Sequence, residues 1–300
     1  MKRLAIIGLG DVSKYVIEGI KKSSDYQIVG LCDKNSEKLK NYNLSNAKLY
    51  SDYKKMISEI DFDYIVLLVH QSYRRDILIE LIRMGHKVIC EKPFACSPDE
   101  MNMILAACKE YSNYPIIMYH RSYNRQISKI YNLLDSKSVK RIEIKYLEEI
   151  GIQSSGDGYK YIDDKHGGGC IQDNFPNCIH YMLNYGDVSL VKCEKKVTDY
   201  CTAAKVYFLL NGQIECNIYL DWHSEIDDKS VVIYTDQEVK HIDLQQGYAI
   251  PKESLIDEYA EFFRNFEKYN LEKMTNIDIK IVGLINDILL YQEEGRNEKR

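Results

Sequence analysis

Short apolar segments that alternate with helical patterns along the first 120 residues place the strongest constraint on the fold of this chain. Almost continuously apolar strands separated by helices are typical of a parallel sheet that helices cover on both faces. We therefore expect a doubly wound α/β domain over residues 1–120. Its strands are expected at 3–7 (RLAII), 27–33 (QIVGLCD), 64–69 (YIVLLV), 87–90 (KVIC) and 115–120 (PIIMYH).

The pattern changes after about residue 135, where strand-like segments follow one another with mostly short turns between them. Two helical segments, at about 253–267 and 275–293, close the chain. This spacing predicts that residues 121–300 form a second α/β domain with a large, mostly antiparallel open sheet and a late helix that packs back on the first domain. Residues 34–50 are polar and rich in Asn and Lys, and we interpret them as a solvated connection.

Charge and cysteine content argue against several classes of protein. The formal net charge is −5 and no basic stripe is present, so a nucleic-acid partner is not expected. The apolar runs, such as 65–69, are too short to cross a membrane. Nine cysteines are scattered without a CxxC pair and no HxxxH spacing occurs, so we expect no metal site and a reducing, cytoplasmic location.

The turn after the first strand is a candidate binding site. Gly8-Leu9-Gly10 opens a helical segment, and glycines there allow a pyrophosphate to approach the helix amino terminus closely. The pair is weak evidence on its own, because Ser13 stands where the GxGxxG pattern has its third glycine. Asp33 ends the second strand, where a carboxylate binds a ribose 2′-hydroxyl and repels a 2′-phosphate. We therefore expect NAD rather than NADP, with a turn-capping Asp33 as the alternative.

Several segments, taken in order, resemble one family. CEKPFACSPDEM at 90–101 resembles the signature of the glucose–fructose oxidoreductase/inositol dehydrogenase/MocA family. MYHRSYN at 118–124, GGGCIQD at 167–173 and ESLIDEYAEFFRNF at 253–266 are similar to its later segments. The resemblance implies an N-terminal Rossmann domain and a second domain whose open sheet pairs with another subunit, giving a homodimer or homotetramer. It also implies NAD(P)-dependent oxidation or reduction of a small sugar, polyol or nucleotide sugar.

The resemblance also implies roles for individual residues. Lys92 of the EKP triplet would polarise the reacting oxygen, since an ammonium stabilises a developing alkoxide. Weaker candidates for lining the substrate pocket are Tyr119, Arg121, Lys160 and Tyr161. The residues expected at the cofactor are Gly8, Leu9, Gly10, Asp11, Val12, Asp33, Val69, His70, Gln71, Glu91, Lys92 and Pro93. Three places depart from the family: Val69-His70 replaces Thr-Pro, Arg74 replaces a histidine, and Ser122 replaces an arginine, although Arg121 is adjacent.

A fourth departure concerns the proton carrier. In the family, an aspartate after the glycine-rich stretch is followed four residues later by a histidine or sometimes a tyrosine, whereas here Asp173 is followed by Asn177. An amide does not titrate, so Asn177 would hold the substrate while Asp173 orients the reacting oxygen. His180 lies one helical turn further on and is the candidate acid/base, although about 5 Å of rise calls for a bridging water or substrate hydroxyl.

Other interpretations of this segment stay open. In one, His180 hydrogen-bonds inside the domain and takes no part in catalysis. In another, the substrate is an imine, whose protonated nitrogen needs no acid/base. In a further one, the chain binds NAD as a sensor or scaffold without turnover. If His180 carries the proton, we expect the pH–rate profile of alcohol oxidation to rise through a pKa near that of an ordinary histidine.

Overall fold

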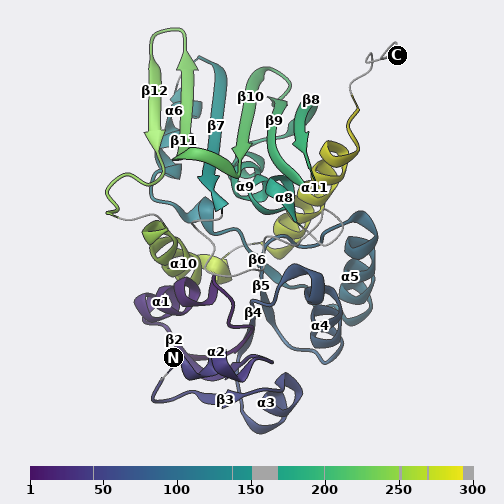
Figure 1. Cartoon of the computed structure of the whole chain (residues 1–300). Coiled ribbons are helices and arrows are strands. Elements are labelled where there is room, and N and C mark those ends of the chain that lie inside the picture. Colours follow the sequence, from purple (N-terminus) through teal and green to yellow (C-terminus); the bar gives the residue numbers. More distant parts are fainter. Residues whose placement is uncertain are drawn as a thin grey trace. The chain divides into compact units, whose positions relative to one another are not determined.

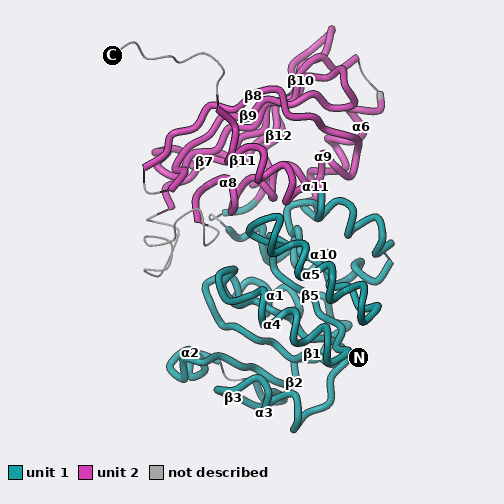
Figure 2. Tube along the Cα trace, turned by 90° about the vertical axis from the view of Figure 1, so that its right-hand side faces the viewer, with its two compact units in different colours: residues 1–124, 248–279 teal, residues 125–247, 280–300 magenta. Residues whose placement is uncertain are grey.

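The computed structural model describes residues 1–42, 44–136, 138–150, 168–198, 200–249, 252–268 and 270–292 (Figure 1). The chain forms two compact units, and each is discontinuous in sequence (Figure 2). Unit 1 consists of residues 1–124 and 248–279, and unit 2 of residues 125–247 with the residues from 280 onward. The expected division into domains at 1–120 and 121–300 stays a prediction.

Unit 1 is built on a sheet of six parallel strands in the order β3-β2-β1-β4-β5-β6. The chain runs outward from β1 through β2 to β3 and then returns to β4 on the other side of β1. The carboxyl ends of β1 and β4 therefore form the switch point at which open α/β sheets bind ligands. The doubly wound parallel sheet expected from the sequence is confirmed. The strands span Lys2–Ile7 (β1), Tyr26–Cys32 (β2), Lys48–Tyr50 (β3), Tyr64–Leu67 (β4), Val88–Glu91 (β5) and Ile116–Met118 (β6).

Two short helices of unit 1, α2 (Ser36–Lys40) and α3 (Tyr53–Glu59), were not expected from the sequence pattern. The interpretation of residues 34–50 as a solvated connection is wrong, because this stretch contains helix α2 and strand β3. Strand β3 has only three residues at the edge of the sheet, and Tyr50 alone among them is buried, so it leaves little apolar pattern. The α-helices of unit 1 are α1 (Ser13–Ser23), α2 (Ser36–Lys40), α3 (Tyr53–Glu59), α4 (Gln71–Arg83), α5 (Pro98–Tyr111) and α10 (Glu253–Asn265). Helix α11 spans Leu271–Leu290, and its residues 271–279 also belong to unit 1.

Helix α10 completes the hydrophobic core of unit 1. Gly19 of α1 allows it to approach closely, because a Cβ at Gly19 would lie 2.6 Å from the Cβ of Tyr259. Phe263 of α10 packs edge-on against Tyr26 of β2 with ring centroids 5.6 Å apart. Phe266, just beyond α10, packs against Tyr26 at 5.9 Å and Tyr64 at 5.3 Å. Residues from late in the chain therefore supply part of the core of the N-terminal sheet.

Unit 2 contains a second six-stranded sheet in the order β12-β11-β7-β10-β9-β8, antiparallel except for the pairing of β7 with β10. Helices α8 (Gly169–Asp173) and α9 (Phe175–Tyr185) lie against one face, and α6 (Ile127–Ser136) packs on α9 (Figure 1). The mostly antiparallel open sheet expected from the sequence is confirmed. The strands span Val139–Glu149 (β7), Val188–Val197 (β8), Cys201–Leu210 (β9), Ile214–Asp221 (β10), His223–Thr235 (β11) and Val239–Asp243 (β12).

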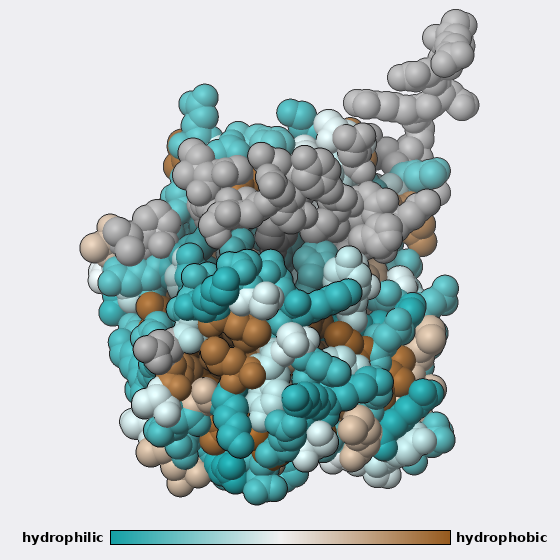
Figure 3. All heavy atoms as spheres, turned by 60° about the horizontal axis from the view of Figure 1, so that its bottom comes forward, coloured by the Kyte–Doolittle hydropathy of each residue, from teal (hydrophilic) through white to brown (hydrophobic). Residues whose placement is uncertain are grey.

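The surface carries mostly hydrophilic residues on the face drawn in Figure 3, with hydrophobic residues gathered in small separate patches. Among the helices of the described ranges, none combines the length and apolar character needed to cross a bilayer.

Candidate active site

The turn after β1 lies at the switch point of the unit 1 sheet. Gly8 has a φ of +96°, and a Cβ at this position would lie 2.6 Å from the backbone nitrogen of Val69. Its N–H donates to the carbonyl of Cys32 at 2.8 Å. A side chain at Gly8 is therefore disfavoured twice, by the backbone conformation and by contact with the segment after β4.

Gly10, two residues further on, is open. A Cβ there would meet nothing within 4 Å, and no side chain in the described part of the chain caps the first turn of α1. Open access to uncapped N–H groups at a helix amino terminus suits a phosphate. Ser13 is buried, and its hydroxyl contacts the Gly10 carbonyl at 2.5 Å and the Tyr42 hydroxyl at 2.7 Å. These contacts satisfy the serine hydroxyl, so serine is accommodated where the family pattern has glycine.

Asp33 connects the end of β2 to the glycine turn. One carboxylate oxygen accepts the N–H of Leu9 at 2.7 Å, and the other accepts the N–H of Asn35 at 2.8 Å. Asp33 thus caps a turn and also faces the glycine turn. Each oxygen keeps a further lone pair that can accept a ribose hydroxyl. The residues present therefore fit a dinucleotide, with its pyrophosphate at Gly10 and a ribose at Asp33.

The segment between β4 and α4 holds three more of the cofactor candidates. Val69 lies against Gly8, and Gln71 begins α4. His70 is the N-cap of α4, because its Nδ1 accepts the N–H of Ser72 at 3.3 Å and lies 2.8 Å from the Ser72 hydroxyl. Asp11 and Val12 lie between Gly10 and α1. The structure thus gathers these candidates on one edge of the unit 1 sheet.

Lys92 lies in a turn directly after β5. The Glu91 carboxylate is buried and accepts a hydrogen bond from the Tyr259 hydroxyl of α10 at 2.5 Å. The peptide bond between Lys92 and Pro93 is cis. The backbone carbonyls of Glu91 and Pro93 both accept hydrogen bonds from Arg74. The residues on either side of Lys92 are therefore fixed by α4 and α10.

The start of α5 follows this turn and has the capping pattern that the sequence indicates. Ser97 is the N-cap and accepts the N–H of Glu100 at 3.2 Å, and Pro98 occupies the first helical turn. The Glu100 carboxylate in return accepts the N–H of Cys96 at 3.0 Å. This reciprocal capping box fixes the exit of the chain from the Lys92 turn.

Arg121, a candidate for lining the substrate pocket, lies in the interior of unit 1. It is 2% exposed and donates to the buried carboxylate of Glu258 at 2.7 Å. The same carboxylate accepts from His120 at 2.7 Å and from Asn124 at 2.6 Å. Sequence reasoning missed Glu258, although it falls on the apolar stripe of α10 together with Leu255 and Phe262, where an acidic residue is unusual. The pocket-lining role of Arg121 stays a prediction.

Tyr119, the neighbouring candidate, is 1% exposed and lies near Asp278 of α11. Burial raises the pKa of Asp278 well above its usual range, and the nearby Tyr119 side chain only partly offsets this. Both side chains belong to unit 1. Lys160 and Tyr161, the other two pocket candidates, lie outside the described residues. Within the described ranges, no group of three His, Cys, Asp or Glu side chains is arranged to hold a metal ion.

The remaining candidates belong to unit 2, where α8 ends and α9 begins. Asp173 is the last residue of α8 and is half-buried. Asn177 is 3% exposed, and no group in the described part of the chain donates to its amide oxygen. A buried acceptor without a donor costs about 1–3 kcal/mol. This oxygen is therefore suited to a hydroxyl or N–H group of a ligand.

His180 lies one turn after Asn177 on α9. Its Nδ1 is 3.3 Å from the amide nitrogen of Asn184. Burial lowers the pKa of His180 to about 3. The expectation of an ordinary histidine pKa is therefore wrong, since imidazolium loses more solvation on burial than neutral imidazole does. The role of His180 as acid/base stays a prediction.

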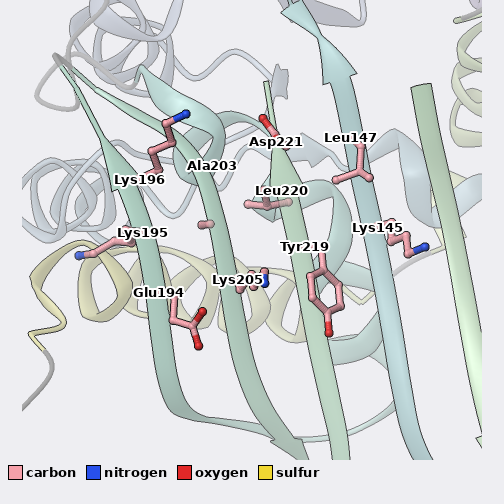
Figure 4. Close-up of a pocket in the computed structure, with 11 residues that line it drawn as sticks. Lys145, Leu147, Glu194, Lys195, Lys196, Ala203, Lys205, Tyr219, Leu220 and Asp221 are labelled. Atoms are coloured by element: carbon pink, nitrogen blue, oxygen red, sulfur yellow. The ribbon is translucent and has the colours of Figure 1, made fainter. Parts of the chain in front are cut away.

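The other face of the unit 2 sheet contains a hollow of about 360 Å³ (Figure 4). Asn177 and His180 do not line it, so it is separate from the candidate residues of α9. Its lining includes Lys145 of β7, Glu194 of β8, Ala203 and Lys205 of β9, and Tyr219 and Asp221 of β10.

Comparison with known proteins gives a family for the N-terminal part. Residues 2–120 match the family model described as an oxidoreductase family with an NAD-binding Rossmann fold. The chain is 23% identical to the trans-1,2-dihydrobenzene-1,2-diol dehydrogenase of Xenopus tropicalis over 164 residues, 53% of this chain and 48% of that protein. It is 28% identical to the D-apiose dehydrogenase of Paraburkholderia graminis over 124 residues, 41% of this chain and 32% of that protein. The match therefore spans about half of these curated relatives or less.

Solved structures extend the likeness in fold to nearly the whole chain. A putative myo-inositol dehydrogenase from Sinorhizobium meliloti 1021 has a TM-score of 0.81 at 14% identity, with 96% of each chain covered. The WlbA dehydrogenase from Bordetella pertussis, in complex with NADH and UDP-GlcNAcA, has a TM-score of 0.79 at 14% identity, covering 96% of this chain and 94% of that one.

Fold and glycine turn together define a protein with an NAD-binding Rossmann unit and a second unit built on an open sheet. Residues 2–120 match the model of the glucose–fructose oxidoreductase/inositol dehydrogenase/MocA family, and the solved structures extend the likeness in fold. The family is NAD-binding, which confirms the class of cofactor expected from Gly8, Gly10 and Asp33.

Proposed function

We propose that this chain is an NAD-dependent oxidoreductase that transfers a hydride to or from a hydroxyl or ketone carbon of a sugar, polyol or nucleotide sugar. The observation that carries the proposal lies within unit 1, where the sheet edge that bears the dinucleotide turn also bears the anchored Lys92 turn. Curated relatives named as diol and apiose dehydrogenases support the substrate class. When bound, the nicotinamide supplies or accepts the hydride.

The side chains divide the remaining work. The Lys92 ammonium donates a hydrogen bond to the reacting oxygen and stabilises its developing charge. Asp173 orients that oxygen, and the amide oxygen of Asn177 accepts a neighbouring substrate hydroxyl. His180 is the candidate proton acceptor; burial keeps its ring neutral by lowering its pKa to about 3, which also makes it a weak base.

A substrate panel tests the proposal. The purified chain is mixed with NAD⁺ or NADH and with sugars, polyols, nucleotide sugars and cyclic imines, and nicotinamide absorbance is followed. Turnover of hydroxyl or ketone compounds supports the proposal. Turnover of imines alone would identify an imine reductase, and NADH binding without any turnover would identify a sensor or scaffold.

Cofactor choice should depend on Asp33. We expect NADH to bind more tightly than NADPH, because the carboxylate repels a 2′-phosphate while it accepts a ribose hydroxyl. Asp33→Ala should narrow the ratio of the two dissociation constants, mainly by improving NADPH binding. Fluorescence titration of both cofactors measures the ratio, and tighter NADPH binding by the unaltered chain would refute the assignment.

His180 should not shape the pH profile of the reaction. Because burial already keeps the imidazole neutral, the profiles of the unaltered chain and of His180→Gln should have the same form between about pH 5 and 9. Initial rates across this range provide the measurement. The unaltered chain could instead show a change of rate near the ordinary histidine pKa that is absent in His180→Gln. That result would contradict the lowered pKa of His180.

We further propose that the chain forms a homodimer or homotetramer in the cytoplasm through the open face of the unit 2 sheet. That face carries ordered cation–aromatic pairs, with Arg141 over Tyr234 at 4.1 Å and Lys192 over Tyr207 at 4.3 Å. All nine cysteines are free, which supports a reducing compartment. Light scattering should give a mass of two or four chains of 35.1 kDa, and the mass of one chain would contradict the assembly.

A further inference from the structure

We infer that Arg74 is a positioning residue whose guanidinium holds the backbone on both sides of Lys92 and fastens it to the segment after β4. In the part that concerns turnover, this inference rests on the proposed function, whereas the geometric part stands without it. Arg74 stands where the family that the sequence resembles has a histidine.

The guanidinium of Arg74 bridges two segments that are far apart in sequence. Its Nη1 donates to the carbonyl of Glu91 at 2.6 Å and to the carbonyl of Pro93 at 2.9 Å. Its Nη2 and Nε lie 3.2 and 3.4 Å from the carbonyl of Val69. Arg74 therefore contacts the residue before Lys92, the residue after it, and Val69 in the segment that follows β4.

Because Arg74 is buried, its charge must be stabilised by these hydrogen bonds rather than by water. Arg74 is 7% exposed, and a buried cation that lost its hydrogen-bond partners would be strongly destabilising. Three carbonyl oxygens can solvate it only where they converge, so the cation restricts the positions that those carbonyls adopt. Arginine suits this task because its donors form a rigid planar fork, whereas a lysine ammonium is a compact point charge on a flexible stem.

The Val69 contact links the Lys92 turn to the cofactor turn. The nitrogen of Val69 would lie 2.6 Å from a Cβ at Gly8, so the two backbones are packed together there. Arg74 binds the carbonyl of Val69 and both carbonyls that flank Lys92. The place of the lysine relative to the dinucleotide turn is therefore set by one buried side chain from the first turns of α4.

The other anchors of the turn act on different atoms. Tyr259 binds the carboxylate of Glu91 rather than its backbone, and the capping box of α5 begins only at Cys96. Loss of Arg74 should therefore loosen the backbone between these anchors without opening β5 or α5.

Hydrogen exchange followed by mass spectrometry tests the geometric part without any substrate. In Arg74→Ala, the amides of Lys92 and of residues 94–97 should exchange about tenfold faster, because the carbonyls of Glu91 and Pro93 lose their donor. Arg74→Lys should lie between this variant and the unaltered chain. The matched control is Arg83→Ala, which removes an exposed arginine from the last turn of the same helix and should leave native-state exchange of Lys92 and residues 94–97 unchanged.

Two results would contradict the positioning role of Arg74. One is a folded Arg74→Ala variant whose turn exchanges at the rate of the unaltered chain. If Arg74→Ala does not fold, Arg74→Lys decides instead, and an exchange rate of the Lys92 turn equal to that of the unaltered chain would contradict the role. Faster exchange throughout unit 1 in Arg74→Lys would also contradict a local role.

A kinetic arm tests the consequence for Lys92. NADH binding should change little in Arg74→Ala, whereas kcat should fall about tenfold to a hundredfold, as a displaced catalytic group causes, with partial recovery in Arg74→Lys. A rise in KM with unchanged kcat would show that Arg74 does not position Lys92. If the unaltered chain turns over no compound of the panel, the proposed function fails. The hydrogen-exchange result alone then decides whether Arg74 positions the Lys92 turn.

Discussion

Lys92→Ala should lower turnover by about two to four orders of magnitude, the usual effect of removing a positioned proton-transfer or electrostatic group. NADH affinity should change little, because the dinucleotide contacts lie at Gly10 and Asp33. The loss should therefore appear in kcat, measured from initial rates with the best substrate of the panel.

Lys87→Ala is the matched control, since Lys87 is an exposed lysine at the amino-terminal end of β5, whereas Lys92 follows its carboxyl-terminal end. It removes the same charge and should leave kcat near that of the unaltered chain. If turnover of Lys92→Ala stays within a few-fold of the unaltered chain, Lys92 does not stabilise the reacting oxygen.

Glu258→Ala should be the most destabilising of the changes considered, at about 3–5 kcal/mol, because it leaves a buried guanidinium without its carboxylate. Glu258 is 1% exposed and its partner Arg121 is 2% exposed, so water does not replace the lost contact. Urea unfolding measures the difference. Glu261→Ala, on the same helix but with an exposed ion pair to Arg264, should cost about 0–1 kcal/mol. Similar losses in the two variants would contradict the buried network.

The acid dependence of stability provides a second readout of Glu258. Burial by itself would raise its pKa, but the charge of Arg121 and the hydrogen bonds from His120 and Asn124 outweigh burial, so the pKa lies below its usual range. A depressed carboxyl pKa contributes stability above the unfolded value of about 4.3 and loses it as the pH falls through the folded value. The unfolding free energies of the unaltered chain and of Glu258→Ala should therefore converge in acid.

The parallel sheet and the glycine turn could be predicted from sequence because both depend on local pattern. Five strands of unit 1 are nearly all apolar, and Gly8, Gly10 and Asp33 stand at fixed offsets from strand ends. The capping box at Ser97 is likewise local. Strand β3 escaped prediction because an edge strand of three residues carries almost no periodicity.

The contacts of Arg74 and Arg121 could not be predicted, because each depends on partners that only the fold brings near. Arg121 meets Glu258 from 137 residues away, and the carbonyls that surround Arg74 come from two separate turns. A backbone carbonyl is present at every residue and so leaves no mark in the sequence. The lowered pKa of His180 is also a property of its surroundings, since the residue type alone suggests an ordinary value.

The contribution of α10 to unit 1 has a consequence for synthesis of the chain on the ribosome. The nascent chain leaves unit 1 at residue 124 and re-enters it at residue 248. At about 5–20 residues per second, several seconds to half a minute pass before Phe263 and Phe266 can reach Tyr26. During that interval the parallel strands exist without part of their aromatic core. Completion of the NAD-binding fold is therefore a late event in translation, although most of its sequence is made first.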